Sequence, residues 1–228
     1  MTTLLATAVL IGFLHALEVD HMLAVTTFVS RRPAVPLAAR FGARWGIGHS
    51  LAVLGAGGLL LAFGVRWPVA WDAAGEGLVG VMLAALGLWA IVSARRLHLH
   101  PAPEHGDHSH LHLHPGASGH AHPHSAGSGA GHSHGAVTAV GFVHGLAGTS
   151  AAVALVPVTF MDDAGAGLGY LAAFCVGVTL AMTLFAAIAA AAMRRAERRS
   201  LLWSRRIATA VGIAAIGTGA FWMFSALG

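Results

Sequence analysis

Long apolar runs alternate with short polar segments along this chain, and the runs are long enough to cross a lipid bilayer. An α-helix needs about 20 residues to span roughly 30 Å of hydrocarbon at about 1.5 Å per residue. Runs of that length lie near residues 4–28, 45–64, 75–94, 137–159, 165–193 and 205–227. The pattern predicts an all-α integral membrane protein with six transmembrane helices.

The composition also indicates a membrane protein. Hydrophobic residues make up 56% of the 228-residue chain and charged residues only 10%, whereas a soluble domain holds about 25% charged residues. The net charge of +4 comes from arginines that lie between the apolar runs and not along one helix face. We therefore expect a lipid bilayer, and no nucleic acid, as partner. The single cysteine, Cys175, excludes an internal disulfide and a cysteine-based metal site.

The distribution of arginine predicts which loops face the cytoplasm. Twelve of the 13 basic residues follow the first, third or fifth span, which puts them on one side of the membrane. They are Arg31, Arg32, Arg40, Arg44, Arg95, Arg96, Arg194, Arg195, Arg198, Arg199, Arg205 and Arg206. By the positive-inside rule we expect a multi-pass protein of the cell (inner) membrane with both termini outside. Trp45, Trp67, Trp71, Trp203 and Trp222 lie near span ends, where we expect an aromatic belt.

The first apolar run carries a group of ionisable residues near its middle. His15, Glu18, Asp20 and His21 interrupt a stretch that is otherwise apolar. A charged residue at the bilayer centre costs about 2.5–3.5 kcal/mol even on the gentler insertion scales, and such residues usually face a cavity, an ion path or one another. We therefore expect these four side chains to be functional.

A straight helix cannot direct all four of these side chains at one ion. At about 100° per residue, His15, Glu18 and His21 share an arc of about 120°. Asp20 points about 140° away from His15. Two arrangements remain open. In the first, Asp20 supports a metal ligand without binding the ion, or it contacts a neighbouring helix. In the second, the helix is unwound near Glu18 and Val19, as transporter helices often are at their binding sites.

The two halves of the chain resemble each other. Gly12-Phe13-Leu14-His15-Ala16-Leu17 matches Gly141-Phe142-Val143-His144-Gly145-Leu146 at an offset of 129, and Gly48-His49-Ser50 aligns with Gly177-Val178-Thr179 at the same offset. Residues 81–87 resemble residues 211–217 at an offset of 130. Because each half has an odd number of crossings, the second half must be inverted in the membrane. We expect two inverted three-helix repeats, residues 1–96 and 137–228, with a site near the midplane where they meet.

The halves differ in their chemistry. At the positions equivalent to Glu18, Asp20, His21 and His49 the second half has Ala147, Thr149, Ser150 and Val178. We expect one asymmetric metal site, to which the first half contributes His15, Glu18, Asp20, His21 and His49, and the second half His144. For His49 and His144 the alternative is a hydrogen bond or contact between packed helices.

Residues 97–136 join the halves and differ in kind. This segment is rich in Gly, Ser, Pro and Ala and holds 12 of the 16 histidines, mostly as His-x-His pairs. Such a composition forms no packed core, so we expect a disordered cytoplasmic loop. Its imidazoles would capture nickel, cobalt, copper or zinc alike, and the alternative is a low-complexity linker.

These motifs resemble those of a known family. His15-Ala16-Leu17-Glu18-Val19-Asp20-His21 is similar to the H-x4-D-H signature of the nickel/cobalt transporter family, and Gly48-His49-Ser50 resembles its G-H-S element. With His144-Gly145-Leu146 added, the pattern is more similar to the UreH-type six-span urease accessory permeases. The His-rich loop resembles that of the nickel/cobalt efflux proteins. The resemblance implies translocation of Ni²⁺ or Co²⁺, with His15, Asp20, His21 and His49 as the positions carried over.

We therefore predict a permease and not an enzyme. Its substrate is a divalent metal ion, nickel or else cobalt, partly dehydrated by His15, His21 and His49 while Asp20 and Glu18 offset its charge. No cofactor beyond the transported ion is expected. Both directions stay open: uptake for metallochaperones or for urease or hydrogenase maturation proteins, and efflux. A membrane metallochaperone or sensor that binds the metal without transport is the alternative from another class.

Overall fold

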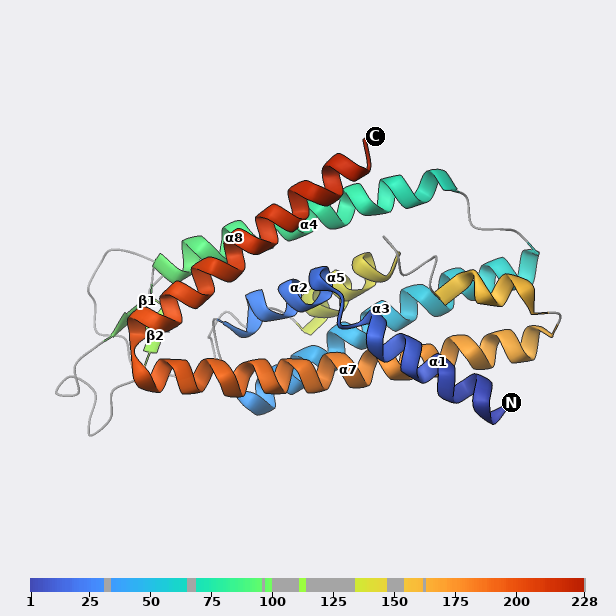
Figure 1. The fold of residues 1–228 in the computed structure, drawn as a ribbon, viewed down its shortest axis with the longest axis horizontal. Helices are drawn as coiled ribbons and strands as arrows, with labels where there is room; N and C mark the ends of the chain where they lie inside the picture. Colours follow the sequence, from blue (N-terminus) through green and yellow to red (C-terminus); the bar gives the residue numbers. More distant parts are fainter. Residues whose placement is uncertain are drawn as a thin grey trace.

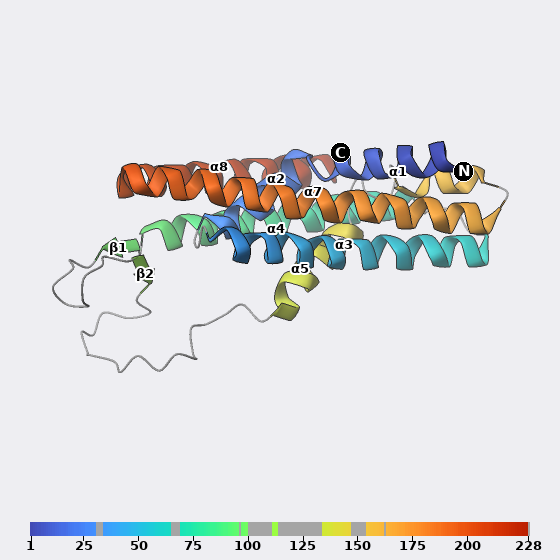
Figure 2. The same cartoon turned by 90° about the horizontal axis from the view of Figure 1, so that it is seen from below.

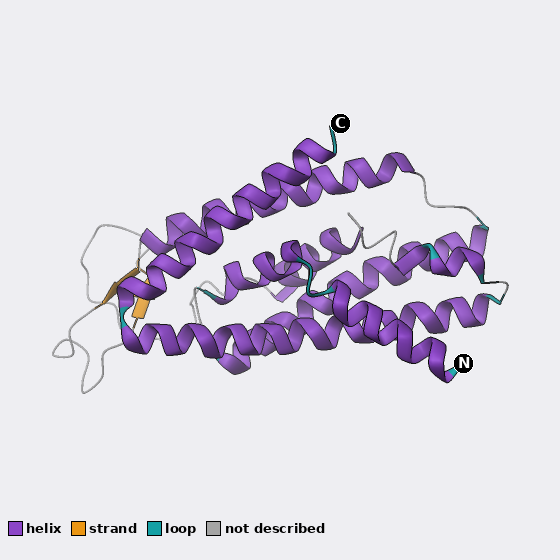
Figure 3. Cartoon of the chain, viewed as in Figure 1, coloured by secondary structure: helices purple, strands orange, loops and turns teal. Residues whose placement is uncertain are grey.

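A computed structural model describes residues 1–30, 34–64, 69–95, 97–99, 111–113, 134–146, 154–161 and 163–227, and these are helical almost throughout (Figures 1 and 3). The α-helices are α1 (Thr2–His15), α2 (Val19–Val29), α3 (Val35–Phe63), α4 (Val69–Arg95), α5 (His134–Leu146), α7 (Ala164–Arg199) and α8 (Leu201–Ser225). A 3₁₀-helix, η2 (Pro157–Phe160), and two short strands, β1 (Leu97–Leu99) and β2 (Leu111–Leu113), complete the order. The helical class of the described chain agrees with the prediction.

Several helices have the length and apolar character of membrane spans. Within the described residues there are four: Val35–Phe63, Ala73–Ala94, Ala164–Arg199 and Leu202–Ser225. Helices α1 and α2 qualify only as a pair, bent by 61° at their junction, which raises the number to five. Helix α5 has 13 residues and is shorter than a span. The multi-pass membrane character is therefore supported, while the count of six spans stays a prediction.

Two expected spans are not continuous helices. The first breaks between His15 and Val19, where the N–H of Leu17 and of Glu18 bond to carbonyls three residues earlier and Glu18 is extended (φ −63°, ψ 152°). The unwinding considered near Glu18 is thus present. The fourth does not continue as an α-helix to residue 159, because Pro157 begins the 3₁₀-helix η2. Proline is tolerated in the first turn of a helix, but in the interior of a helix it removes a backbone hydrogen-bond donor.

Side chains at the helix ends fix where the longest helices start and stop. Helix α3 begins with a proline in its first turn and ends at Gly64, whose φ of 62° is left-handed and suits glycine. Asp163 caps α7 by accepting from the N–H groups of Gly165 and Ala166 at 2.9 and 3.3 Å. Ser200 separates α7 from α8 with an extended backbone and caps α8 by accepting from Leu202 N–H. These caps satisfy backbone donors that a helix N-terminus leaves unpaired.

The helices pack as a main bundle and a separate helix pair. Helix α3 packs against α7 and α5, and α1 packs against α7, so these four elements surround the largest buried cluster (Figures 1 and 2). Helices α4 and α8 run side by side as a separate pair, which α2 joins through a smaller cluster around Ala24, Val79 and Leu83. Helix α2 therefore lies between the main bundle and the α4–α8 pair.

Glycines bring the helices of the main bundle into backbone contact. A methyl group at Gly12 would collide with the carbonyl of Phe174, and one at Gly141 would collide with the carbonyl of Trp45. In the same way Gly48 lies against Thr138, and Gly177 against Val9. Small residues at helix crossings permit such close packing in membranes. Gly145 likewise lies against the backbone of His49.

The segment predicted to be a disordered loop is described only in part. Leu97–Leu99 and Leu111–Leu113 pair as antiparallel strands, with Leu97 opposite Leu113 and Leu99 opposite Leu111. Alternating Leu-His-Leu suits such a paired strand, and the disorder expected of the segment as a whole stays a prediction. Helix α5 already starts at His134. Residues 100–110 and 114–133, with most of the His-x-His pairs, lie outside the described residues.

Candidate functional site: a buried histidine cluster

Four helices bring the predicted ligands to one place. His15 ends α1, Asp20 and His21 lie in the first turn of α2, His49 is in the middle of α3, and His144 is in the last turn of α5. All five side chains are buried, and His49 is 0% exposed. The break in the first span is what lets His15 and His21 face the same point, because a straight helix would separate them by about 120°.

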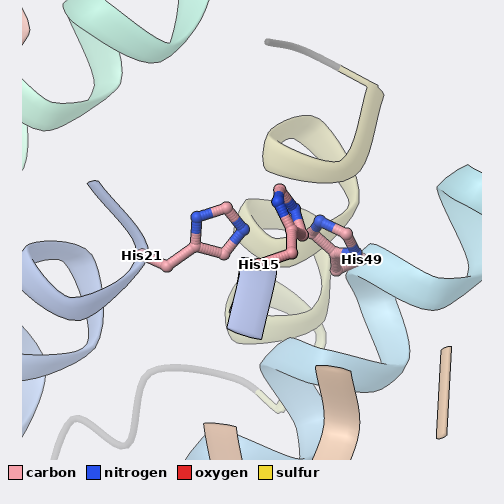
Figure 4. A group of neighbouring side chains, drawn as sticks. All are labelled: His15, His21 and His49. Atoms are coloured by element: carbon pink, nitrogen blue, oxygen red, sulfur yellow. The ribbon is translucent and has the colours of Figure 1, made fainter. Parts of the chain in front are cut away.

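His15, His21 and His49 form the tightest group. Each offers one ligand atom, and these atoms all lie within 4.8 Å of one another. Their ring centroids are 4.7 Å apart for His15 and His21, 5.6 Å for His15 and His49, and 5.4 Å for His21 and His49. Figure 4 shows the three imidazoles gathered between the helices that carry them. Three histidines brought this close in a buried place are suited to bind one cation.

Asp20 joins two histidines from different halves of the chain. Its Oδ1 accepts from the backbone N–H and from Nδ1–H of His21, both at 2.9 Å. Its Oδ2 accepts from Nε2–H of His144 at 3.0 Å. Both carboxylate oxygens are therefore used by protein donors. Of the two roles left open by the sequence, Asp20 contacts a neighbouring helix, α5, while it orients His21.

Glu18 contacts the third histidine in the same way. Its Oε1 lies 2.9 Å from Nδ1 of His15 and accepts a hydrogen bond there. Its side chain is 36% exposed, whereas that of His15 is 1% exposed. The carboxylate thus lies at the edge of the cluster with only its tip turned to the imidazole. Glu18 thus hydrogen-bonds one histidine of the cluster, and Asp20 hydrogen-bonds two.

These hydrogen bonds determine which imidazole nitrogens carry lone pairs. A carboxylate that accepts from Nδ1–H leaves Nε2 of the same ring unprotonated. His15 and His21 therefore present Nε2 as a metal-binding atom. His144 is bonded through Nε2–H, so its lone pair is on Nδ1. Neutral imidazole is a good ligand for nickel, copper, zinc and iron, and a carboxylate behind it increases its basicity.

His144 stands apart from the compact group. It belongs to a second set, Asp20, His21 and His144, whose ligand atoms also lie within 4.8 Å of one another. Its ring centroid is 4.1 Å from that of His21 but 6.4 Å from that of His49. Five of the six predicted residues thus fall into two groups that share His21, and Glu18 contacts the first group through its hydrogen bond with His15.

Two aromatic residues form walls of the cluster, and the sequence did not single them out. Trp45 is 0% exposed and contacts the rings of His21, His49 and His144, with centroid distances of 5.2, 5.7 and 5.1 Å. The interfacial role expected of Trp45 is therefore wrong. Phe174 is equally buried, and its ring centroid is 5.6 Å from that of His15. Residues 45 and 174 are one repeat offset of 129 apart, and Trp45 precedes His49 by one helical turn; both signals were available.

The second half contributes little polar chemistry of its own. Val178, at the position equivalent to His49, is buried among apolar side chains. Ala147, Thr149 and Ser150, equivalent to Glu18, Asp20 and His21, lie outside the described residues. Among the described residues of the second half, His144 is the one predicted ligand, and it belongs to the site. The predicted asymmetry of the two halves agrees with this arrangement.

Comparison with known proteins finds a relative along most of the chain. The urease accessory protein UreH of Bacillus sp. (strain TB-90) is 30% identical over 185 residues, a segment that covers 81% of this chain and 75% of the relative. No model of a protein family matches the chain, and no solved structure gives a significant match.

Proposed function

The chain belongs to the family of the urease accessory protein UreH, and from that membership and the geometry of its site we propose that it is a membrane permease for divalent nickel. Cobalt is a second substrate of the same chemistry. The relative is named as an accessory of urease, so the proposed role is to supply metal for urease maturation. Metallochaperones or urease and hydrogenase maturation proteins are the partners that such a role requires.

The observation that carries this proposal is the burial of His15 and His21, on either side of the break in an apolar helix, together with His49 of α3. Polar groups that deep in a membrane protein are costly and usually mark an ion path. Discontinuous helices are typical of transporter binding sites, because unwound backbone and side chains can then face a cavity together. A site of three neutral imidazoles has lone pairs and no thiolate, which fits Ni²⁺ and Co²⁺.

We further propose that Glu18 and Asp20 offset the charge of the ion without binding it. Asp20 is already engaged on both oxygens, and Glu18 reaches the cluster through His15. The ion would then be held by three neutral ligands, with two carboxylates one ring further out. Selection between nickel and cobalt would rest on geometry and availability, since raw affinity favours copper over both.

The architecture that we propose is two inverted three-helix repeats that cross the membrane six times. A two-fold axis requires that every contact between the halves occur twice, with the roles of the halves exchanged. The contacts of Gly12 with Phe174 and of Gly141 with Trp45 are such a pair at the offset of 129, and so are those of Gly48 with Thr138 and of Gly177 with Val9. On the axis itself equivalent residues should meet, and the hydroxyls of Ser50 and Thr179 are 3.3 Å apart.

The third helices support the same symmetry with a different alignment. Gly80 lies against Gly219, and Gly87 lies against Gly212. Exchange of the halves interchanges these two contacts when the offset between α4 and α8 is 132, two residues more than the sequence similarity suggested. In this arrangement the loops rich in arginine face the cytoplasm, both termini face outward, and the two halves rock about the ion.

Nickel transport by the purified full chain in proteoliposomes tests the proposal. Wild-type protein should accumulate nickel inside the vesicles, and His21→Ala should reduce the initial rate by at least about tenfold because it removes a ligand. A chain without residues 100–133 should keep most of its transport, since the deletion removes no residue of the buried cluster. The opposite result, with flux unchanged in His21→Ala and lost in the deletion, would favour a membrane metallochaperone and contradict the permease.

A further inference from the structure

His144 carries a buried nitrogen that the three-histidine group does not use. Its Nε2–H donates to Asp20, so Nδ1 holds the lone pair. The residue is 1% exposed, and no hydrogen-bond partner for Nδ1 exists among the residues that the structure describes. An unsatisfied buried polar group costs about 1–3 kcal/mol. A buried nitrogen without a partner next to the proposed cation site therefore indicates that Nδ1 of His144 has a functional role.

The nearest histidine ring offers a second lone pair. The ring centroids of His144 and His21 are 4.1 Å apart, the shortest of the histidine pairs measured in the cluster. Nε2 of His21 is also buried and, within the described chain, has no hydrogen-bond partner. Asp20 keeps both rings in place through its two oxygens. The two imidazoles are thus held side by side, with their remaining nitrogens available to a cation.

His15 and His144 occupy equivalent places in the two repeats, at the offset of 129. Both rings contact His21, with centroid distances of 4.7 and 4.1 Å. His21 itself has no histidine equivalent in the second half. His21 therefore contacts both members of a repeat-related pair of histidines.

We infer that the ion has a second position, between His21 and His144, which it enters after leaving the group of His15, His21 and His49. This inference rests on the proposed transport function. In the first position all ligands come from the first half, and in the second His144 replaces its equivalent, His15. His21 stays bound to the ion in both. Because one imidazole arrives as another leaves, the ion passes from one half to the other without losing all its ligands at once.

Equilibrium binding and transport, measured on the same preparations, separate the two positions. Nickel affinity is determined by calorimetry on the full chain in detergent, and the initial rate of nickel transport in proteoliposomes. His144→Ala should keep an affinity within about threefold of wild type, because the first position is intact, and should transport at least about tenfold more slowly. His15→Ala should lose at least about tenfold in affinity. Leu146→Ala, an exposed residue of the same helix, is the matched control and should change neither value.

His144→Gln provides the second variant and decides the question if His144→Ala does not fold. Glutamine keeps an N–H for Asp20 but has no nitrogen lone pair, so it should bind nickel normally and transport slowly. The inference is wrong if either variant loses as much affinity as His15→Ala, because His144 would then be a ligand of the first position. It is also wrong if both variants transport at the wild-type rate. A wild-type protein that transports no nickel contradicts the proposed function instead.

Discussion

At the scale of single residues, the carboxylates of the cluster act through the histidines that they contact. Asp20 accepts hydrogen bonds from His21 and His144, and Glu18 accepts one from His15. Each bond fixes the orientation of a ring and the nitrogen that carries its lone pair. Under this assignment, loss of a carboxylate should disturb the ligands without removing any of them.

Asp20→Asn should therefore weaken nickel binding by about 10-fold and Asp20→Ala by up to about 100-fold, the range found when supporting groups behind metal ligands are changed. Asparagine keeps one oxygen for Nδ1–H of His21, whereas alanine keeps none. X-ray absorption of the bound nickel should show the same number of imidazole ligands in Asp20→Asn as in wild type. Asp163→Asn is the matched control, because Asp163 caps α7 far along the chain and asparagine caps equally well. A loss of one oxygen ligand in Asp20→Asn would make Asp20 a direct ligand.

Trp45 should contribute mainly through packing. It is completely buried against three histidines, so Trp45→Ala leaves a large cavity and should lower the free energy of unfolding by about 3–5 kcal/mol. Unfolding of the purified protein in mixed micelles with increasing SDS measures this. Trp203→Ala, at a residue that is 57% exposed, should change the free energy by no more than about 0.5 kcal/mol. Equal effects of the two substitutions would contradict the assigned role of Trp45.

The residue types of the site could be predicted from the sequence, but its geometry could not. The cost of burying His15, Glu18, Asp20 and His21 in an apolar run identifies them without coordinates. That Asp20 reaches His144 depends on the angle between α2 and α5, which are 124 positions apart at this contact. Local sequence does not encode that angle. Trp45 lies near the end of an apolar run, which is typical of a membrane interface, but it also lies one helical turn before His49, a spacing that puts both side chains on one face of the helix.

At the scale of the elements, the helices are held together by glycines at defined crossings. Helix α3 contains glycines that lie at such a crossing and glycines that have no close neighbour. Gly42 lies against the backbone of Met182 and the side chain of Ala186, whereas nothing lies within 4 Å of the place where a Cβ on Gly55 would be. The two positions therefore differ in packing while they share the same helix.

Gly42→Ala should destabilise the protein by about 1–3 kcal/mol, because the added methyl group has no room and the two helices must move apart. Gly55→Ala should stabilise it by about 0.4–1 kcal/mol, since alanine restricts the unfolded chain and meets no neighbour. The same unfolding experiment in mixed micelles measures both variants. If both changed stability in the same direction, the crossing of α3 and α7 at Gly42 would be wrong.

Element boundaries were predictable only where a local cause exists. For the first span, the geometry of its four polar residues leaves two arrangements open, a break near Glu18 or a separate role for Asp20, and the structure has both features. In the fourth expected span, residues 137–159, the stretch of residues 147–153 lies outside the described chain. Pro157 does mark the later change to a 3₁₀-helix. A hydropathy pattern reports which residues avoid water and says less about whether their backbone is continuous.

At the scale of the whole molecule, the repeat was the part of the sequence that carried the most long-range information. An offset of 129 pairs residues that meet across the bundle, such as Ser50 with Thr179. The alignment of the third helices was less accurate, because Ala, Gly and Leu match at many registers, and the packed glycines support 132. Most of the His-rich segment lies outside the described residues, so its composition remains the main information about it.

The proposed orientation makes a prediction that the single cysteine renders simple to test. Cys175 is buried, so a Cys175→Ala background removes the one native thiol and leaves the protein surface unchanged. In that background Phe160→Cys, at a residue that is 81% exposed in the proposed outer connection, should react with a membrane-impermeant maleimide on intact cells. Arg206→Cys, at an exposed position in the second turn of α8, should react only after the membrane is permeabilised, because the positive-inside rule keeps this arginine-rich end of α8 in the cytoplasm. The reverse pattern would invert the protein, and labelling of both sites from outside would mean that α7 does not cross the membrane.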